Sequence, residues 1–145
     1  MKLTLAIILF FLSLNSAKGE IIDSYSSVCT IHTEIKESWT GGTGFVFKED
    51  ETNFYIMTAG HVVDECINDY CDLYFFNNGE ALKPIKGKII KIDYNKNTSI
   101  AHNVLVRDLA ILKASKEDFK KINFTPKIIP LAPKNTKLKI KEQIF

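Results

Sequence analysis

The sequence has little excess charge and few cysteines or histidines, and each shortage argues against a class of function. It carries 19 Lys and Arg against 17 Asp and Glu, a net charge of +2, which gives no electrostatic case for a nucleic-acid partner. The close pair Cys66 and Cys71 has no second pair beside it, and His32 and His102 stand in separate strand-like segments without ligand spacing. We therefore expect no metal site, no other cofactor and no nucleic acid.

Long apolar runs are also scarce, and the single one lies at the start of the chain. Lys2 provides a positive beginning, residues 3–14 are apolar apart from two hydroxyl side chains, and Ala17-Lys18-Gly19 is a small-x-small cleavage pattern. The run is too short to span a bilayer. We expect a signal peptide over residues 1–19, a secreted or periplasmic product, no membrane partner once the signal is removed, and about one domain over residues 20–145.

The remaining chain reads as short β-strands separated by turn residues. Strands are expected at residues 28–35, 45–47, 54–57, 73–76, 85–92 and 104–112, with a last one from Leu138. Turns are expected at Gly41-Gly42, at the acidic segment 49–53 and at Asn77-Asn78-Gly79, and a short helical turn over residues 62–66. Residues 115–121 are expected to form a loop or one helical turn. Six or seven strands suffice to close one small antiparallel β-barrel, so the fold class expected is all-β.

One histidine and one aspartate each stand next to an apolar strand. His61 follows Phe54-Tyr55-Ile56-Met57-Thr58-Ala59-Gly60, and Asp108, 47 positions later, precedes Leu109-Ala110-Ile111-Leu112. A carboxylate that fixes the tautomer of an imidazole allows that imidazole to act as a general base. Such a histidine and aspartate are two of the three members of a catalytic triad. Asp72 and Asp93 are competing candidates for the carboxylate.

Three segments together resemble a known family. Gly42-Thr43-Gly44-Phe45-Val46-Phe47, then Tyr55 to Val63, then Arg107 to Lys113 are similar in order and spacing to the first half of trypsin-like (chymotrypsin-fold) serine peptidases. The resemblance covers roughly residues 28–145 and implies the first of two β-barrels. It implies that His61 is the general base and Asp108 its orienting partner, and that the substrate is a protein or peptide. Gly42 and Gly44 are expected to serve close backbone approach or a positive φ angle rather than chemistry.

The second half of that family's site has no counterpart in the sequence. There is no Gly-x-Ser-Gly turn, the last glycine is Gly87, and the serines after the histidine, Ser99 and Ser115, lack flanking glycines. In the family, the nucleophile, the oxyanion hole and the specificity pocket come from the second barrel. The 145 residues alone are therefore expected to show no peptidase turnover.

The three cysteines carry a separate expectation. In an oxidising compartment, Cys66 and Cys71 are close enough in sequence to close a small disulfide loop. Cys29 is then left over, either as a buried free thiol on a strand or bonded to a cysteine of a missing segment or of another molecule.

Two functional classes stay open. In the first, the chain is the His- and Asp-bearing half of a secreted serine endopeptidase, and its partner is a missing carboxy-terminal barrel. In the second, it is a non-catalytic single-barrel module derived from such a peptidase, and a covering protein binds the face left without the second barrel.

Overall fold

The chain folds around one closed β-barrel. The computed structural model describes residues 25–36, 38–95 and 107–133. Seven strands run in the order β1 (Val28–Ile35), β2 (Ser38–Glu49), β3 (Asn53–Thr58), β4 (Tyr70–Asn77), β5 (Glu80–Ala81), β6 (Ile85–Tyr94) and β7 (Asp108–Ser115). In these described ranges, two short helices accompany the strands: the 3-10 turn η1 (Gly60–Val62) and α2 (Lys116–Lys121).

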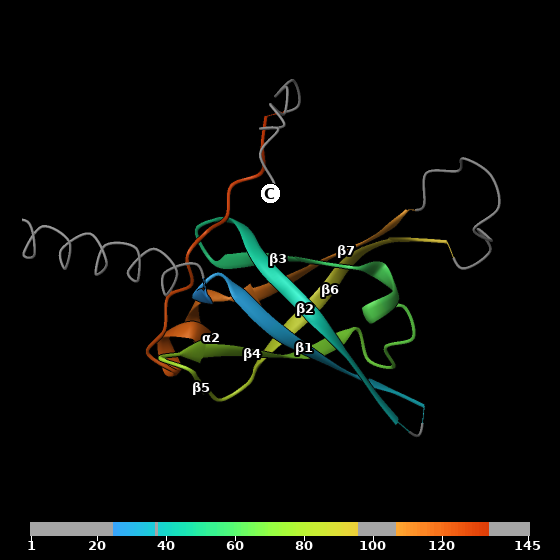
Figure 1. Ribbon diagram of the computed structural model, residues 1–145, viewed down its shortest axis with the longest axis horizontal. Helices are drawn as coiled ribbons and strands as arrows, with labels where there is room; N and C mark the ends of the chain where they lie inside the picture. The colour runs from blue at the N-terminus through green and yellow to red at the C-terminus, as the bar shows by residue number, and fades with distance from the viewer. Residues whose placement is uncertain (1–24, 37, 96–106, 134–145) are drawn as a thin grey trace, which may run out of the picture.

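All strand pairings are antiparallel, and one of them closes the barrel. The sheet order is β1-β2-β3-β7-β6-β4-β5, and β1 pairs additionally with β4, so that six strands form a ring and β5 extends it (Figure 1). The expected single antiparallel β-barrel is confirmed. Within the described ranges, no helix is long and apolar enough to cross a membrane.

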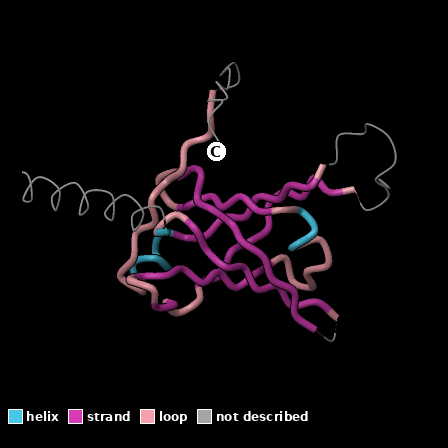
Figure 2. The backbone as a smooth tube through the Cα atoms, viewed as in Figure 1, coloured by secondary structure: helices cyan, strands magenta, loops and turns pink. Residues whose placement is uncertain are grey.

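The composition of the barrel interior follows from the way successive side chains of each strand point alternately inward and outward. Along β3 and β7 every second residue is buried, and the fully buried aliphatic side chains of the ring meet inside it. They are Ile31, Val46, Ile56, Leu73 and Leu112. The two helices lie at opposite ends of this interior (Figure 2).

An aromatic cluster fills the end at α2. Ser115 accepts a hydrogen bond from the backbone N–H of Glu117 and so caps the helix, which carries Phe119 into the barrel. The Phe119 ring meets Phe54 edge-on at a centroid distance of 4.9 Å and Phe75 at 5.1 Å. The short helix expected near residues 115–121 is thus present, and its role is to close this end of the core.

Most of the expected segments agree with the structure, and three details differ. Gly41-Gly42 is not a turn, because both residues pair inside β2 with His32 and Ile31. The helical turn begins at Gly60 and includes the histidine, rather than following it at residues 62–66. β7 begins at Asp108 and continues to Ser115, and residues 104–106 and the strand expected from Leu138 lie outside the described residues.

The glycines explain the first of these differences. A Cβ atom on Gly42 would lie 2.5 Å from Val62 Cγ2, and one on Gly44 would lie 2.8 Å from Ile56 Cγ2. Neither residue has a positive φ. Their small size serves close packing, which lets β2 pass over the η1 turn without breaking its pairing.

Candidate functional site

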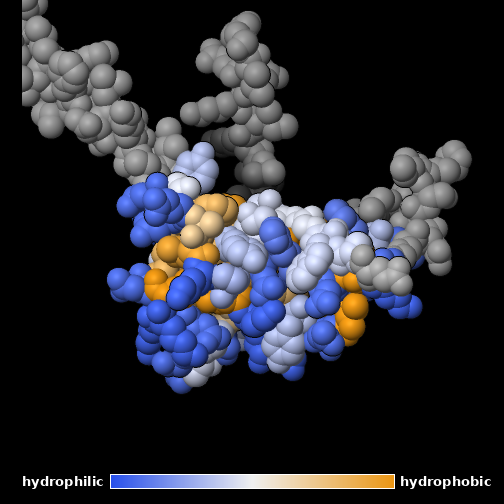
Figure 3. All heavy atoms as spheres, turned by 90° about the horizontal axis from the view of Figure 1, so that it is seen from below, coloured by the Kyte–Doolittle hydropathy of each residue, from blue (hydrophilic) through white to orange (hydrophobic). Residues whose placement is uncertain are grey.

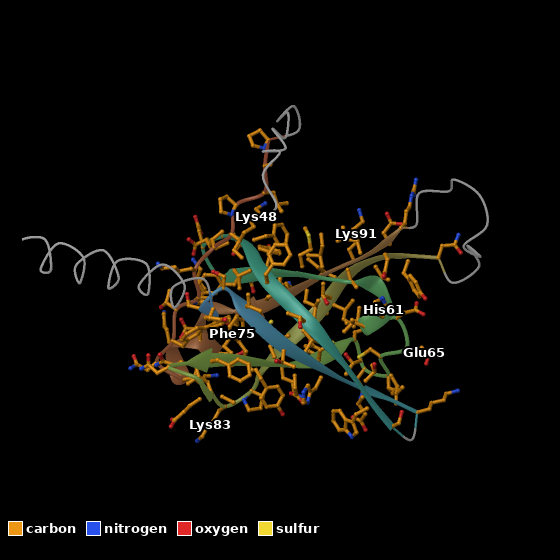
Figure 4. The ribbon with its side chains drawn as sticks, in the orientation of Figure 1. Lys48, His61, Glu65, Phe75, Lys83 and Lys91 are labelled. Atoms are coloured by element: carbon orange, nitrogen blue, oxygen red, sulfur yellow. The ribbon has the colours of Figure 1, made fainter. Side chains whose placement is uncertain are left out.

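His61 and Asp108 meet at the end of the barrel opposite α2. The register of β3 and β7 pairs Thr58 with Ala110, and continuing this antiparallel register by two residues brings Gly60 opposite Asp108. The residues on either side of the 47-residue gap are therefore brought together by strand pairing. Figure 4 shows His61 on the η1 turn at this end.

The carboxylate of Asp108 holds the histidine by two contacts. One oxygen, Oδ2, lies 2.7 Å from His61 Nδ1, and the other, Oδ1, accepts a hydrogen bond of 2.9 Å from the backbone N–H of His61. The close approach expected from the sequence is confirmed. A carboxylate at Nδ1 favours the tautomer with its proton on Nδ1, which leaves Nε2 as the basic nitrogen.

These contacts also set the charge of the aspartate. The backbone N–H of His61, followed by the imidazole itself, holds the pKa of the Asp108 carboxyl below its ordinary value. Asp108 therefore stays ionised at neutral pH. Its side chain is 29% exposed and that of His61 is 59% exposed, so the imidazole is the more open member of the pair.

The η1 turn is held in place by small contacts on either side of the histidine. Thr58 Oγ1 donates a 2.9 Å hydrogen bond to the carbonyl oxygen of Thr43, which ties the end of β3 to β2. After the histidine, Val63 N–H donates to Gly60 O at 3.1 Å. The imidazole thus projects from a backbone segment that is fixed at both ends.

Gly60 has a positioning role that the sequence pattern alone did not reveal. A Cβ atom there would lie 2.6 Å from Tyr94 Cβ and 3.2 Å from Asp108 Oδ1. Only a residue without a side chain allows the carboxylate and β6 to approach this closely. Tyr94 was not singled out either, although its ring lies edge-on to His61 at a centroid distance of 6.3 Å.

A cleft borders the histidine. Its volume is about 230 Å³, and its lining is Ile35, Thr40, His61, Asp64, Glu65 and Tyr94. A larger, mainly apolar cavity of about 790 Å³ lies elsewhere, lined by Tyr25, Val28, Phe76 and Phe124 among others. Apolar atoms gather toward the α2 end of the face shown in Figure 3. The larger cavity is lined by neither member of the His–Asp pair, so the smaller cleft is the one that His61 borders.

Among the described residues, no other candidate forms a hydrogen bond or ion pair with His61. Asp72 forms an ion pair of 2.7 Å with Lys86, and Asp93 lies 3.9 Å from Arg107. Ser115 caps α2 at the far end of β7, seven residues and about 23 Å from Asp108. Ser99 and His102 lie outside the described residues. Of the competing aspartates, Asp108 is the one that contacts the histidine.

The expected disulfide is absent. Cys29, Cys66 and Cys71 are all free thiols in the structure. Cys71 is buried on β4, where its sulfur accepts a 3.4 Å hydrogen bond from Thr33, and Cys66 donates to the Tyr70 carbonyl at 3.3 Å. The structure shows no Cys66–Cys71 bond, although the Cys66 thiol lies close enough to Cys71 to contribute, after burial, to the raised pKa of Cys71. Cys29 is a buried thiol on β1, which was one of its expected states.

Burial makes two of these thiols weak acids. Removal from water raises the pKa of Cys29 and of Cys71 to about 12 each. Neither is a nucleophile at neutral pH. Among the described residues, no three His, Cys, Asp or Glu side chains are grouped closely enough to hold a metal ion.

Comparison with known proteins identifies no relative of this chain. A scan against models of protein families finds no match to the chain, and a search of curated proteins finds none either.

Proposed function

We propose that this chain is the general-base half of a secreted serine-type endopeptidase similar to the trypsin-like enzymes. The observation that carries the proposal is the Asp108 carboxylate, which contacts both the ring and the backbone N–H of His61. A carboxylate held in this way fixes the imidazole in the orientation and tautomer that a general base requires. The site residues proposed are His61 and Asp108.

In the proposed reaction, His61 carries the proton. Nε2 takes the proton of an attacking serine hydroxyl, and the Asp108 carboxylate stabilises the imidazolium that results. The imidazolium then donates this proton to the leaving amine of the peptide. Asp108 remains ionised throughout, in keeping with its lowered pKa.

The hydroxyl and the oxyanion donors are proposed to come from a second barrel. The 145 residues contain no Gly-x-Ser-Gly segment, and Ser115 is occupied as a helix cap. Without a nucleophile, the His–Asp pair has no group to activate. Residues 1–19 are proposed to direct the chain out of the cytoplasm, which N-terminal sequencing of the exported product tests by its first residue, Glu20.

Two experiments test the peptidase proposal. Purified residues 20–145 should not react with a fluorophosphonate or hydrolyse casein. Joining any downstream coding segment that contains a serine in a glycine-rich turn should create activity, and His61→Ala should then lower turnover by roughly 10⁴–10⁶-fold. The matched control is His32→Ala, since His32 packs on Tyr74 away from the site. Equal losses from both substitutions would contradict the assignment of His61.

A second candidate is a protein-binding module, and exposed aromatic and aliphatic groups favour it. Trp39 is 63% exposed and Ile67 is 52% exposed. Isolated proteins rarely leave such groups uncovered when they form a patch. The transcript distinguishes the two: an in-frame serine turn downstream supports the peptidase, whereas a stop codon after Phe145 with export of the short product supports the module.

A further inference from the structure

A row of lysine and tyrosine side chains crosses the outside of the barrel. The strand registers pair Lys48 on β2 with Tyr55 on β3, Tyr55 with Lys113 on β7, Lys113 with Lys88 on β6, and Lys88 with Tyr70 on β4. Five adjacent strands thus each contribute one residue. We call this set, Lys48, Tyr55, Lys113, Lys88 and Tyr70, the lysine row.

The row faces solvent. Tyr55 lies between the buried Phe54 and Ile56, and Lys113 lies between the buried Leu112 and Ala114. Because successive side chains of a strand point to opposite faces, both must point outward. Lys48 and Lys88 are exposed as well.

The lysines of the row are not paired with any acid that the structure describes. In the described part of the chain, none of the three forms an ion pair, and Lys48 and Lys88 lie over the rings of Tyr55 and Tyr70 at 5.7 and 5.9 Å. Lys88 and Lys113 are directly opposed across β6 and β7, an arrangement in which like charges repel. An anion placed between them removes that repulsion.

The neighbouring carboxylates are already engaged. At the β2–β3 hairpin, Asp50 accepts a 2.6 Å hydrogen bond from the Tyr55 hydroxyl, which is the first cause of the lowered pKa of this aspartate. Glu49 is paired with Lys116. Glu49 is therefore balanced by Lys116, whereas Asp50, whose hydrogen-bond donors are neutral, keeps its negative charge at the β2–β3 end of the row.

A fourth lysine extends the charge along β6. Lys91 is opposed to Ile111, which lies two residues before Lys113 on β7. In Figure 4, Lys48 and Lys91 stand on the same side of the barrel, whereas Lys83 stands on the other. Lys91 therefore adds a fourth positive charge on the side of the barrel that carries Lys48.

We propose that the lysine row binds a linear sulfated polysaccharide. Four strand spacings of about 4.8 Å make the row about 19 Å long, which suits an extended polymer with regularly placed anionic groups. Single-stranded nucleic acid is the less suitable polyanion, because its bases stack on open aromatic faces. Here the ammonium groups of Lys48 and Lys88 cover the two tyrosine rings. This proposal does not depend on the peptidase function.

The test uses heparin as the probe and the full chain as the protein. We expect heparin to bind at low ionic strength and to weaken steeply as salt rises, because bound counterions are released from the polymer. The double substitution Lys88→Gln with Lys113→Gln should weaken binding by about tenfold at low salt and reduce the salt dependence. It should also raise the melting temperature slightly, which shows that the variant is folded.

The control removes the same charge from another place. In Lys120→Gln with Lys121→Gln, the two lysines lost are on α2, where they pair with Glu117 and Asp118. We expect this variant to bind heparin as the unaltered chain does. Equal weakening by both double variants would overturn the proposal in favour of general charge attraction. Failure to bind heparin at low salt would overturn it directly. Tighter binding of a single-stranded oligonucleotide through Lys88 and Lys113 would replace it with a nucleic-acid site.

Discussion

Replacing Gly60 with alanine tests whether close backbone approach builds the His–Asp pair. The added Cβ would lie 2.6 Å from Tyr94 Cβ, 3.2 Å from Asp108 Oδ1 and 3.3 Å from Leu109 N. Two of these three atoms belong to the start of β7 and one to β6, so the strain cannot be relieved by rotating one flexible side chain. Overpacking of this kind costs about 1–3 kcal/mol. Each kcal/mol lowers the melting temperature of a domain of this size by about 3–6 °C.

Two readouts separate loss of stability from loss of the pair. Thermal denaturation followed by circular dichroism gives the change in melting temperature. NMR of the imidazole nitrogens shows whether the His61 Nδ1 proton remains hydrogen-bonded to Asp108. We expect Gly60→Ala to change both. The comparison is Gly79→Asn, because Gly79 has nothing within 4 Å of its Cβ position, so any loss of stability there comes from its φ of +86° and should leave the His61 imidazole signal unchanged. If Gly60→Ala changed the melting temperature by less than about 1 °C and left the imidazole signal unchanged, the His61–Asp108 contact would not require glycine at position 60.

Further predictions concern the pair, the core and the thiols. Asp108→Asn should shift the tautomer balance of His61 away from the Nδ1–H form, as measured by NMR. Because contacts lower the folded-state pKa of Asp108, it stabilises the fold above the unfolded carboxyl pKa of about 4, and urea denaturation should show that this contribution disappears as pH falls through the lowered folded value. Phe119→Ala should cost about 3–5 kcal/mol by denaturant titration, since the ring is 1% exposed and meets two other rings edge-on; a cost below about 1 kcal/mol would refute its place in the core. Iodoacetamide should label the partly exposed Cys66 in the folded chain, whereas Cys71 should react only after unfolding; early labelling of Cys71 would contradict its burial.

The barrel could be predicted from the sequence because its strands either alternate between apolar and polar residues or are short apolar runs, and turn residues separate them. The sequence also predicted the His61–Asp108 contact, through the resemblance of the flanking segments rather than through any rule of spacing. The 47-residue separation becomes meaningful only once the register of β3 and β7 is known. His61 and Asp108 could be identified from the sequence because their side chains have acid–base chemistry. A glycine whose role is to allow close packing has no such signal.

Gly41, Gly60 and Cys71 show why the rest could not be predicted. Two adjacent glycines usually mark a turn, yet Gly41 continues β2 because its neighbour Gly42 packs closely against Val62. Gly60 is required by atoms of β6 and β7, which are remote in sequence. Cys71 turns inward because of the phase of β4, and this phase depends on pairing with β1 and β6 rather than on the sequence around the cysteine.

Closure of the ring by β1 also has a consequence for how the chain folds. β1 pairs with β2 through a tight local connection, but its other edge meets β4, and β3 meets β7, so residues about 40 to 60 positions apart must find one another. Proteins dominated by such distant pairings fold in milliseconds to seconds, because the entropy of closing long loops is lost before the contacts form. Until β4 arrives, one edge of β1 stays open to pairing with another chain. The speed of ring closure therefore governs how long a newly made chain is exposed to aggregation.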